Sequence, residues 1–256
     1  MTKLPKITNK QREIINLIFR FRFLNRIQIQ KFLNHKDHKT INNWLKDLKE
    51  KEYLERTFKT TFPENTKPAV YHLARKGICF LKEQHNTKTV LKFYRENERS
   101  TSFVGSCLLL ANIYLDLEER SKGEIDFTMA VKSGYSTHLL ADLLSDLKPS
   151  AYIEQLATGR TKQYFLEILY NLPPERLRQR IKKYLVFYES SEWEAETGGS
   201  FPTVLIICPD NNILRYIKKY IQSKLNLLDE PDLAIHLTTE GQVKEAGITG
   251  DIWQLP

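Results

Sequence analysis

Three helix starts lie within the first forty residues, and they constrain the possible fold more than any other feature of the chain. A capping box, in which a polar N-cap residue is followed three positions later by Gln, opens helices at Thr8 and at Asn25. A third start lies at Asp37. The apolar residues that follow it share one helix face, with the spacing i, i+3, i+4 and i+7: Ile41, Trp44, Leu45 and Leu48.

The apolar period changes after the third helix. Residues 53–62 (YLERTFKTTF) are rich in β-branched and aromatic side chains and predict a strand. Residues 63–68 (PENTKP) predict a turn, and residues 69–73 (AVYHL) a returning strand. A short helix over ARKGICFLKEQ follows. This order is typical of a winged helix-turn-helix, which we expect over residues 1–85.

The charge of the chain is divided unequally. Residues 1–100 carry 23 Lys and Arg against 10 Asp and Glu, whereas residues 101–256 carry 16 against 21. A net charge of +13 on residues 1–100, which include the predicted winged helix, favours a polyanionic partner, and double-stranded DNA fits the fold. A basic face that is merely solvated is the alternative, and some winged helices bind proteins instead.

The outward face of the third helix has the chemistry of DNA recognition. Asn side chains can pair with adenine, and Lys can reach guanine or a phosphate. A winged helix inserts this helix into the major groove, while its wing contacts the adjacent backbone. The predicted DNA-binding residues of the helix are His38, Lys39, Thr40, Asn42, Asn43 and Lys46, and those of the wing are Arg56, Lys59, Thr60, Thr61 and Lys67. The second helix adds Arg26, Gln28 and Lys31.

The second half predicts a separate α/β domain. Residues 86–100 are polar and predict a connector, which leaves 101–256 as the domain. A largely apolar helix over Ser102–Glu119 opens it, and strands and helices then alternate in the order β-β-β-α-β-α-β. Residues 138–149 are compatible with a helix or a loop, and residues 189–200 predict an acidic, glycine-containing loop. The fold class expected for the whole chain is therefore α+β.

One predicted helix of this domain is strongly basic. The run PPERLRQRIKKYLVFYES carries five positive charges between Arg176 and Lys183. It is a candidate for a second DNA contact, but a solvated helix face explains the same pattern, and we favour that interpretation from the sequence.

Other classes of chemistry lack sequence support. No phosphate-binding loop, dinucleotide fingerprint or nucleophile elbow occurs, and the six histidines show no ligand spacing, so we expect neither a cofactor nor a metal. Cys79, Cys107 and Cys208 lie far apart in apolar runs and predict buried free thiols. With no secretory signal and no membrane-spanning segment, we expect a cytoplasmic protein.

Several segments together resemble the replication-relaxation family, plasmid-associated bacterial proteins with an N-terminal winged helix. The similar segments are FRFLNRIQIQKFLN, TINNWLKDLKEKEYLER, VYHLARKGICFL, and FLEILYNLPPERLRQRIKKYLVFY with the final GDIWQLP. The resemblance implies a role in plasmid replication, relaxation or transfer. It also implies a C-terminal domain similar to the PD-(D/E)xK nuclease core, also known as the restriction-endonuclease-like core. We expect a second copy of the chain, forming a homodimer, or a different protein partner to bind through that domain.

The chain departs from the nuclease pattern at two positions that the motif requires. Active nucleases of that type carry Asp after Pro and a Glu-x-Lys on the next strand, whereas Pro149 precedes Ser150, and Leu169 stands two residues after Glu167. One carboxylate cannot hold Mg²⁺ alone, so we expect a nuclease-like fold without catalysis, with Glu167 as a weak catalytic candidate. The further candidate acids for such a site are Glu124, Asp126 and Glu154.

Two alternatives to a catalytically inactive plasmid DNA-binding protein stay open from the sequence. One is a metal-dependent endonuclease, and the other is a repressor of its own operon that uses the same winged helix. A smaller departure concerns the residue after the third helix, where similar winged-helix regulators usually carry glycine and this chain has Glu52. Glycine would ease a left-handed residue at the end of the helix, and its absence leaves the rest of the pattern intact.

Overall fold

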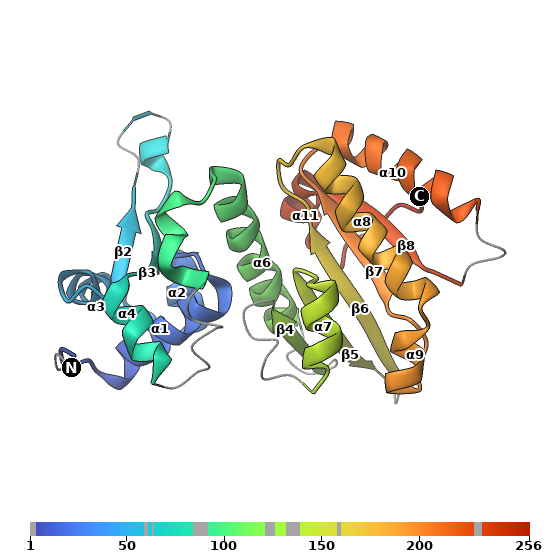
Figure 1. Cartoon of the computed structure of the whole chain (residues 1–256). Helices are drawn as coiled ribbons and strands as arrows, with labels where there is room; N and C mark the ends of the chain where they lie inside the picture. The colour runs from blue at the N-terminus through green and yellow to red at the C-terminus, as the bar shows by residue number, and fades with distance from the viewer. Residues whose placement is uncertain are drawn as a thin grey trace. The chain divides into compact units, whose positions relative to one another are not determined.

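The computed structural model divides the chain into two compact units, Met1–Leu115 and Asp116–Pro256. They are shown in Figure 1 and are described one at a time below. The residues whose structure is described are 4–58, 61–62, 64–83, 92–120, 126–131, 139–157, 160–227 and 232–256. The division after Leu115 lies beyond the end of the connector predicted over residues 86–100.

The N-terminal unit combines helices with a small sheet, in the order expected from the sequence. Its elements are α1 (Asn9–Phe21), β1 (Leu24–Asn25), α2 (Arg26–Phe32), α3 (His38–Glu50), β2 (Leu54–Thr57), η1 (Glu64–Thr66), β3 (Val70–Leu73), α4 (Arg75–Lys82) and η2 (Lys92–Glu98). Helix α6 (Thr101–Arg120) begins in this unit. The strand order is β1-β3-β2, with antiparallel pairing throughout. The two-residue strand β1 was not expected.

Side-chain caps start the first three helices where the sequence places them. Thr8 and Asn25 each form a complete capping box with the Gln three residues later. Asp37 accepts hydrogen bonds from the backbone N–H groups of Lys39 and Thr40. These caps satisfy N–H groups that the helices themselves leave without partners, so they set the first residue of each helix.

Part of the predicted connector packs into the N-terminal unit. Phe93 in η2 is buried, and its ring lies 5.2 Å from that of Phe19. Glu96 is also buried, where it forms an ion pair with Arg22. The expectation that all of residues 86–100 form a polar linker is therefore wrong for η2, because its apolar and acidic side chains have partners in the core. Residues 86–91 lie outside the described part.

The C-terminal unit is built on one five-stranded sheet. Its elements are β4 (Asp126–Val131), α7 (Ala141–Leu147), β5 (Ala151–Ala157), β6 (Arg160–Ile168), α8 (Pro174–Glu189), α9 (Glu192–Thr197), β7 (Thr203–Cys208), α10 (Asn211–Leu225), β8 (Ile235–Thr239) and α11 (Glu240–Ala246). The strands lie in the order β4-β5-β6-β7-β8. Pairing is antiparallel from β4 to β6 and parallel from β6 to β8.

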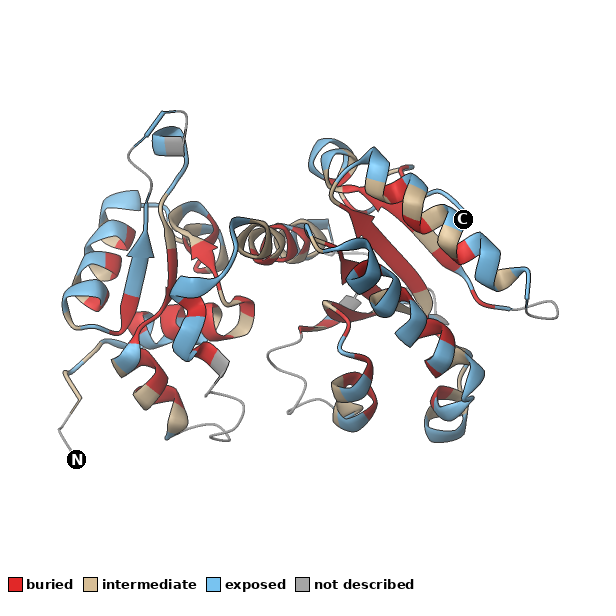
Figure 2. Cartoon of the chain, turned by 45° about the horizontal axis from the view of Figure 1, so that its top comes forward, coloured by how far each residue is buried: buried red, intermediate tan, exposed pale blue. Residues whose placement is uncertain are grey.

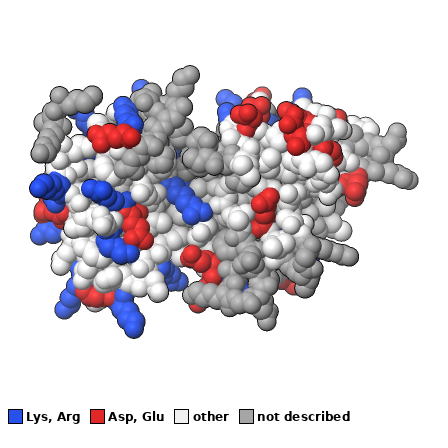
Figure 3. Space-filling view, turned by 90° about the horizontal axis from the view of Figure 1, so that it is seen from below, with Lys and Arg blue, Asp and Glu red and all other residues white. Residues whose placement is uncertain are grey.

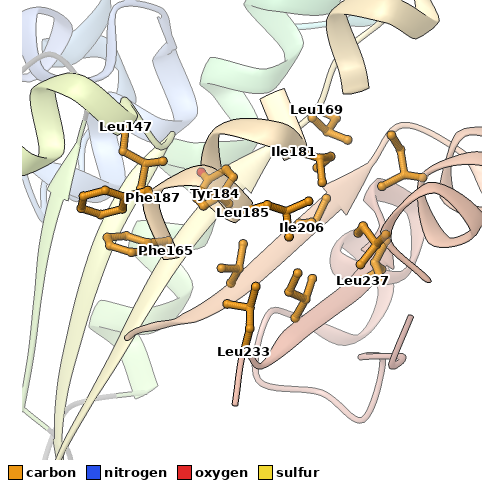
Figure 4. Packing of buried hydrophobic residues seen from close by; sticks show 14 of the residues in the cluster. Leu147, Phe165, Leu169, Ile181, Tyr184, Leu185, Phe187, Ile206, Leu233 and Leu237 are labelled. Carbon is orange, nitrogen blue, oxygen red and sulfur yellow. The ribbon is translucent and has the colours of Figure 1, made fainter. Parts of the chain in front are cut away.

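Helices α8 and α10 bury one face of this sheet. Aromatic and aliphatic side chains of both helices pack against alternate residues of β6, β7 and β8, as Figure 4 shows for Tyr184, Phe165, Ile206 and Leu237. In Figure 2 the inner sides of these helices and the strands beneath them are buried, while the outer sides are exposed. The apolar spacing of the helices and the continuous apolar run of β7, which is buried from Val204 to Cys208, are the patterns from which the sequence predicted them.

The C-terminal unit contains more helices than the sequence predicted. The ambiguous segment 138–149 contains helix α7. The predicted acidic loop contains helix α9, because Trp193 is fully buried and its indole N–H donates to the Ser200 carbonyl. Helix α11 was not expected, although Thr239 and Gln242 form its capping box.

The cysteines are free thiols, as expected, but they are not equally buried. Cys107 and Cys208 are buried, and burial raises the pKa of each thiol to about 12. Cys79 is only half-buried, so the expectation of three buried thiols is wrong at that position. In the part of the chain that the structure covers, no helix is long and apolar enough to cross a membrane.

Gly77 in α4 provides a test of this packing. A Cβ built at Gly77 would lie 2.3 Å from the Tyr53 carbonyl oxygen, which leaves no room for a side chain. We expect Gly77→Ala to lower the free energy of unfolding by about 1–3 kcal/mol, although alanine normally stabilises a helix. Urea unfolding followed by circular dichroism measures this change.

Gly105 in α6 is the matched control, because no described atom lies within 4 Å of the corresponding Cβ. Gly105→Ala should raise the free energy of unfolding by roughly 0.5–1 kcal/mol. Equal effects of the two substitutions would contradict the close approach at Gly77.

Candidate nucleic-acid interface

Helix α3 separates an apolar face from a polar one. Ile41, Leu45 and Leu48 are fully buried. Trp44 is half-buried, with its ring centroid 5.2 Å from that of His35. Five of the six side chains predicted to contact DNA from this helix are exposed: His38, Lys39, Asn42, Asn43 and Lys46. The helix therefore presents one continuous polar face to solvent.

Thr40, the sixth predicted residue, is engaged at the start of the helix. It is half-buried, and its hydroxyl donates to the Asp37 carboxylate. That contact and the backbone N–H groups of Lys39 and Thr40 lower the pKa of Asp37 to about 2. Thr40 thus stabilises the cap of α3, and its hydroxyl proton is already donated.

A groove lies between α3 and the hairpin formed by β2 and β3. Its volume is about 550 Å³, and it is lined by Asn42, Asn43, Leu45, Lys46, Lys49, Glu50, Arg56 and Tyr71. Arg56 reaches it from β2, where it pairs in register with Tyr71 of β3. The structure therefore brings together predicted residues of the helix and of the hairpin. We call this hollow the α3–hairpin groove.

The groove carries mostly positive and amide groups. Lys46, Lys49 and Arg56 supply three cations, and Glu50 is the one acid among the lining residues. The Lys46 Nζ lies 3.8 Å from the Glu50 Oε1 in an exposed pair, which contributes little to stability and leaves the ammonium accessible. On the face drawn in Figure 3, Lys and Arg gather over the N-terminal unit. The groove can therefore attract a phosphate backbone.

Lys49 and Tyr71 line the groove but were missing from the predicted set. Lys49 follows Lys46 by three residues on the same helix, so helical spacing places the two side chains on one face. Tyr71 is a largely buried strand residue, and burial raises the pKa of its hydroxyl. The β2–β3 register that places Tyr71 opposite Arg56 depends on the length of the turn between the strands, which periodicity does not provide.

The remaining hairpin residues are only partly described. The Arg56 guanidinium lies 5.1 Å from the centre of the Phe58 ring, and Arg56 is exposed. Thr61 and Lys67 are exposed, but they do not line the groove. Lys59 and Thr60 lie outside the described residues.

Helix α2 contributes differently from the prediction. Gln28 is buried, and its amide donates to the Leu108 carbonyl and to the Asn112 side chain. Gln28 is therefore a core residue and not a DNA contact. The sequence cannot distinguish the two roles, because the partners of Gln28 lie eighty residues further along the chain.

The chain turns from α3 into the hairpin through a left-handed residue. Glu52 has φ 61°, the conformation that glycine adopts most easily. Its carboxylate pairs with the Lys76 Nζ at 2.9 Å, which lowers its pKa. Its carbonyl oxygen accepts the backbone N–H of Lys76 at 3.1 Å. The left-handed conformation is present without glycine, and contacts to α4 hold it.

The weak catalytic candidate of the C-terminal unit has its oxygens occupied. Glu167 is buried, and both oxygens accept from the Arg180 guanidinium, with Nε to Oε1 at 3.1 Å. The Tyr184 hydroxyl donates to Oε2 at 2.7 Å. Arg180 neutralises the charge that would otherwise attract a cation. Glu167 is therefore a salt-bridged core carboxylate.

The positions around Glu167 do not fit a divalent cation. The Ser150 hydroxyl accepts the backbone N–H of Ile168, and Leu169 is buried. Strand register places Glu154 opposite Gln163, four residues along β6 from Glu167, which corresponds to about 13 Å. Asp126 lies opposite Leu156, still further along the sheet, and Glu124 is outside the described residues. Among the residues described, no three His, Cys, Asp or Glu side chains converge.

The fold and the groove define a class of protein: a two-unit α+β chain with a basic groove in its N-terminal unit. The family follows from comparison with known proteins. The chain belongs to the replication-relaxation family, whose model matches residues 15–204. The family description points to a role in replication or relaxation.

Other comparisons add little. No protein with a curated description matches the chain. One similar solved structure is that of a mutant of Lactococcus lactis ZitR, at 21% identity over 47% of this chain and 79% of the other. The TM-score is 0.28, so this likeness supports no conclusion about fold or function.

The cap of α3 predicts a pH dependence. Because the pKa of Asp37 is lowered to about 2 in the folded state, its stabilising effect is complete above the unfolded pKa of 3.8 and is lost as the pH falls towards 2. Asp37→Asn keeps an N-cap without the charge. We expect the wild type to melt above this variant at pH 6 and the difference to vanish near pH 2, as measured by thermal unfolding. A difference that is independent of pH would contradict the ionised cap.

Proposed function

We propose that this protein binds double-stranded DNA of a plasmid through its N-terminal unit, acting as a winged helix-turn-helix. The observation that carries the proposal is the α3–hairpin groove. There, amide and cationic side chains of one helix face Arg56 of the adjacent strand. In this arrangement α3 enters the major groove and the hairpin follows the neighbouring backbone.

The side chains of α3 divide into two chemical roles. Asn42 and Asn43 can each pair with the edge of adenine, which provides sequence discrimination. Lys39 and Lys46 are long enough to reach guanine or phosphate oxygens. The N-terminal end of α3 adds partial positive charge, although Asp37 already accepts two of its N–H groups. Base recognition therefore depends mainly on the exposed side chains.

The hairpin contributes electrostatic contacts. Arg56 lies at the edge of the groove and carries a charge that its exposed position leaves open to a phosphate. Contacts of this kind set the register of a protein on the duplex without reading sequence. From their sequence, Lys59, Thr60 and Lys67 are proposed to add contacts of the same kind.

We propose further that the C-terminal unit has no nuclease activity. The support is chemical: the Glu167 oxygens are occupied by Arg180 and Tyr184. A Mg²⁺ ion needs several oxygen ligands together with accompanying water, and the residues around Glu167 do not supply them. The unit instead provides a scaffold for self-association or for a partner protein. Membership of the replication-relaxation family supports a role for this activity in plasmid replication, relaxation or transfer.

The DNA-binding proposal is tested on the outward face of α3. Plasmid and genomic fragments bound by the wild-type protein are sequenced first, which identifies a duplex and shows whether it lies at an origin, a transfer region or the gene's own promoter. The triple variant Lys39→Ala, Asn43→Ala, Lys46→Ala should then bind that duplex about 100-fold more weakly or worse. Each base contact contributes roughly 1–3 kcal/mol of discrimination.

The matched control removes similar groups elsewhere in the same unit: Lys6→Ala, Lys10→Ala, Asn16→Ala, all exposed and outside the groove. Its affinity should stay within a few-fold of wild type in the same anisotropy titration. Unchanged circular dichroism is required of both variants. If the α3 variant binds as well as this control, the assignment of α3 is wrong.

The absence of nuclease activity is tested with supercoiled plasmid in Mg²⁺ or Mn²⁺. We expect no nicked or linear product above the level of the Glu167→Gln variant. Nicking by the wild type that disappears in Glu167→Gln would refute the proposal and favour the endonuclease alternative.

A further inference from the structure

Helices α8 and α10 lie side by side on one face of the C-terminal sheet. Each connects neighbouring parallel strands, α8 between β6 and β7 and α10 between β7 and β8. Their inner side chains share a single core. Figure 1 shows the two helices beside each other, and Figure 2 shows that their outer sides are exposed. The sequence separates these helices, so the surface that they form jointly is visible only in the structure.

Positive charge is concentrated on these two helices. The unit as a whole is acidic, with 16 Lys and Arg against 21 Asp and Glu in residues 116–256, yet nine of the sixteen cations lie in α8 and α10. Helix α10 contains no acid, and α8 has only Glu175 and Glu189, at its two ends. A basic surface therefore stands out against an acidic unit.

Two of the nine cations contact other residues of the C-terminal unit. Arg180 pairs with Glu167, and the Lys218 Nζ donates to the Leu255 carbonyl. The other seven are exposed and form no ion pair with any carboxylate that the structure describes: Arg176, Arg178, Lys182, Lys183, Arg215, Lys219 and Lys224. We call these seven residues and the surface that they occupy the α8–α10 face.

This composition argues against a merely solvated surface. Solvated helices usually alternate the sign of their charges, so that Glu and Lys four residues apart support each other. Lys244 and Glu240 of α11, in the same unit, are such a pair at 2.5 Å. The α8–α10 face has no counterpart to it. Seven cations without acids repel one another, and a bound polyanion would relieve that repulsion.

We propose that the α8–α10 face is a second contact for the phosphate backbone of duplex DNA. The proposal rests on the proposed function, because the duplex bound by α3 supplies the polyanion at high local concentration. Sequence would be recognised by the N-terminal unit, and the C-terminal unit would add affinity without adding sequence preference. From sequence alone, the basic run of α8 predicts a solvated face. The cations of α10, which form no ion pair with a described carboxylate, favour a DNA contact instead.

The chemistry of the face favours duplex phosphates over other nucleic-acid contacts. Single strands are usually bound by stacking bases on exposed aromatic rings. In α8 and α10, Tyr184 and Phe187 are buried, and Tyr188, Tyr216 and Tyr220 are only half-exposed. Lys and Arg on two neighbouring helices, each about 22–24 Å long, can span several phosphates of a duplex.

The test uses the full-length protein with three lysines on the outer sides of both helices replaced: Lys182→Gln, Lys183→Gln, Lys219→Gln. The matched control replaces three exposed lysines of the same unit outside these helices: Lys148→Gln, Lys162→Gln, Lys244→Gln. Affinity for a labelled duplex of about 40 base pairs, roughly four helical turns, is measured by anisotropy between about 50 and 200 mM salt.

We expect the face variant to bind at least fivefold more weakly at low salt. The slope of log K against log salt should fall by up to about 2.7, since each lost phosphate contact removes about 0.9. The ratio of affinities for the selected duplex and an unrelated one should stay unchanged. If the face variant matches the control in slope and affinity, the inference is overturned.

Two further measurements separate this inference from the proposed function. If the α3 variant binds DNA normally while the face variant loses its salt slope, the proposed function fails and the second contact stands. If the α3 variant loses DNA binding while the face variant behaves as the control, the proposed function stands and the second contact is overturned. Binding to phosphatidylserine vesicles is measured in parallel. Loss of vesicle binding with unchanged DNA binding would assign the face to membranes and overturn the proposal.

Discussion

The backbone approach between α4 and the junction after α3 is the constraint on which the candidate interface depends. The Tyr53 carbonyl accepts the backbone N–H of Ala74 at 3.0 Å and leaves room only for glycine at position 77. Glu52, in its left-handed conformation, is held by Lys76 on the same helix. Because the junction is held from α4, the hairpin cannot move freely relative to α3, and Arg56 stays at the edge of the groove.

Local physics made much of the N-terminal unit predictable. Polar caps at Thr8, Asn25 and Asp37 identify helix starts because a bare helix end leaves N–H groups without partners. The apolar stripe of α3 identified the outward face, since a helix buries one side only. What could not be predicted depends on contacts distant in sequence. Gln28 is a core residue because of α6, and Tyr71 lines the groove because of the strand register.

In the C-terminal unit, too, local patterns predicted some elements, and contacts distant in sequence determined others. The continuous apolar strand β7 and the alternation in α8 were evident, because their burial follows from periodicity. Helix α9 was not, because its acidic composition predicts a loop, whereas the burial of Trp193 in the core stabilises the helix. The juxtaposition of α8 and α10 was equally invisible, since it arises from the parallel order of β6, β7 and β8.

The Glu167–Arg180 pair has a consequence for how this sequence could change over evolution. Removing Arg180 alone would leave a buried carboxylate uncompensated, at a cost of about 3–5 kcal/mol. Lysine at position 169 would enter the core without a partner, and Asp at position 150, just before β5, would add negative charge next to the backbone of Ile168. Each of these three substitutions alone is therefore expected to lower stability. Because the losses come before any gain in metal binding, they oppose the stepwise evolution of a metal centre at Glu167.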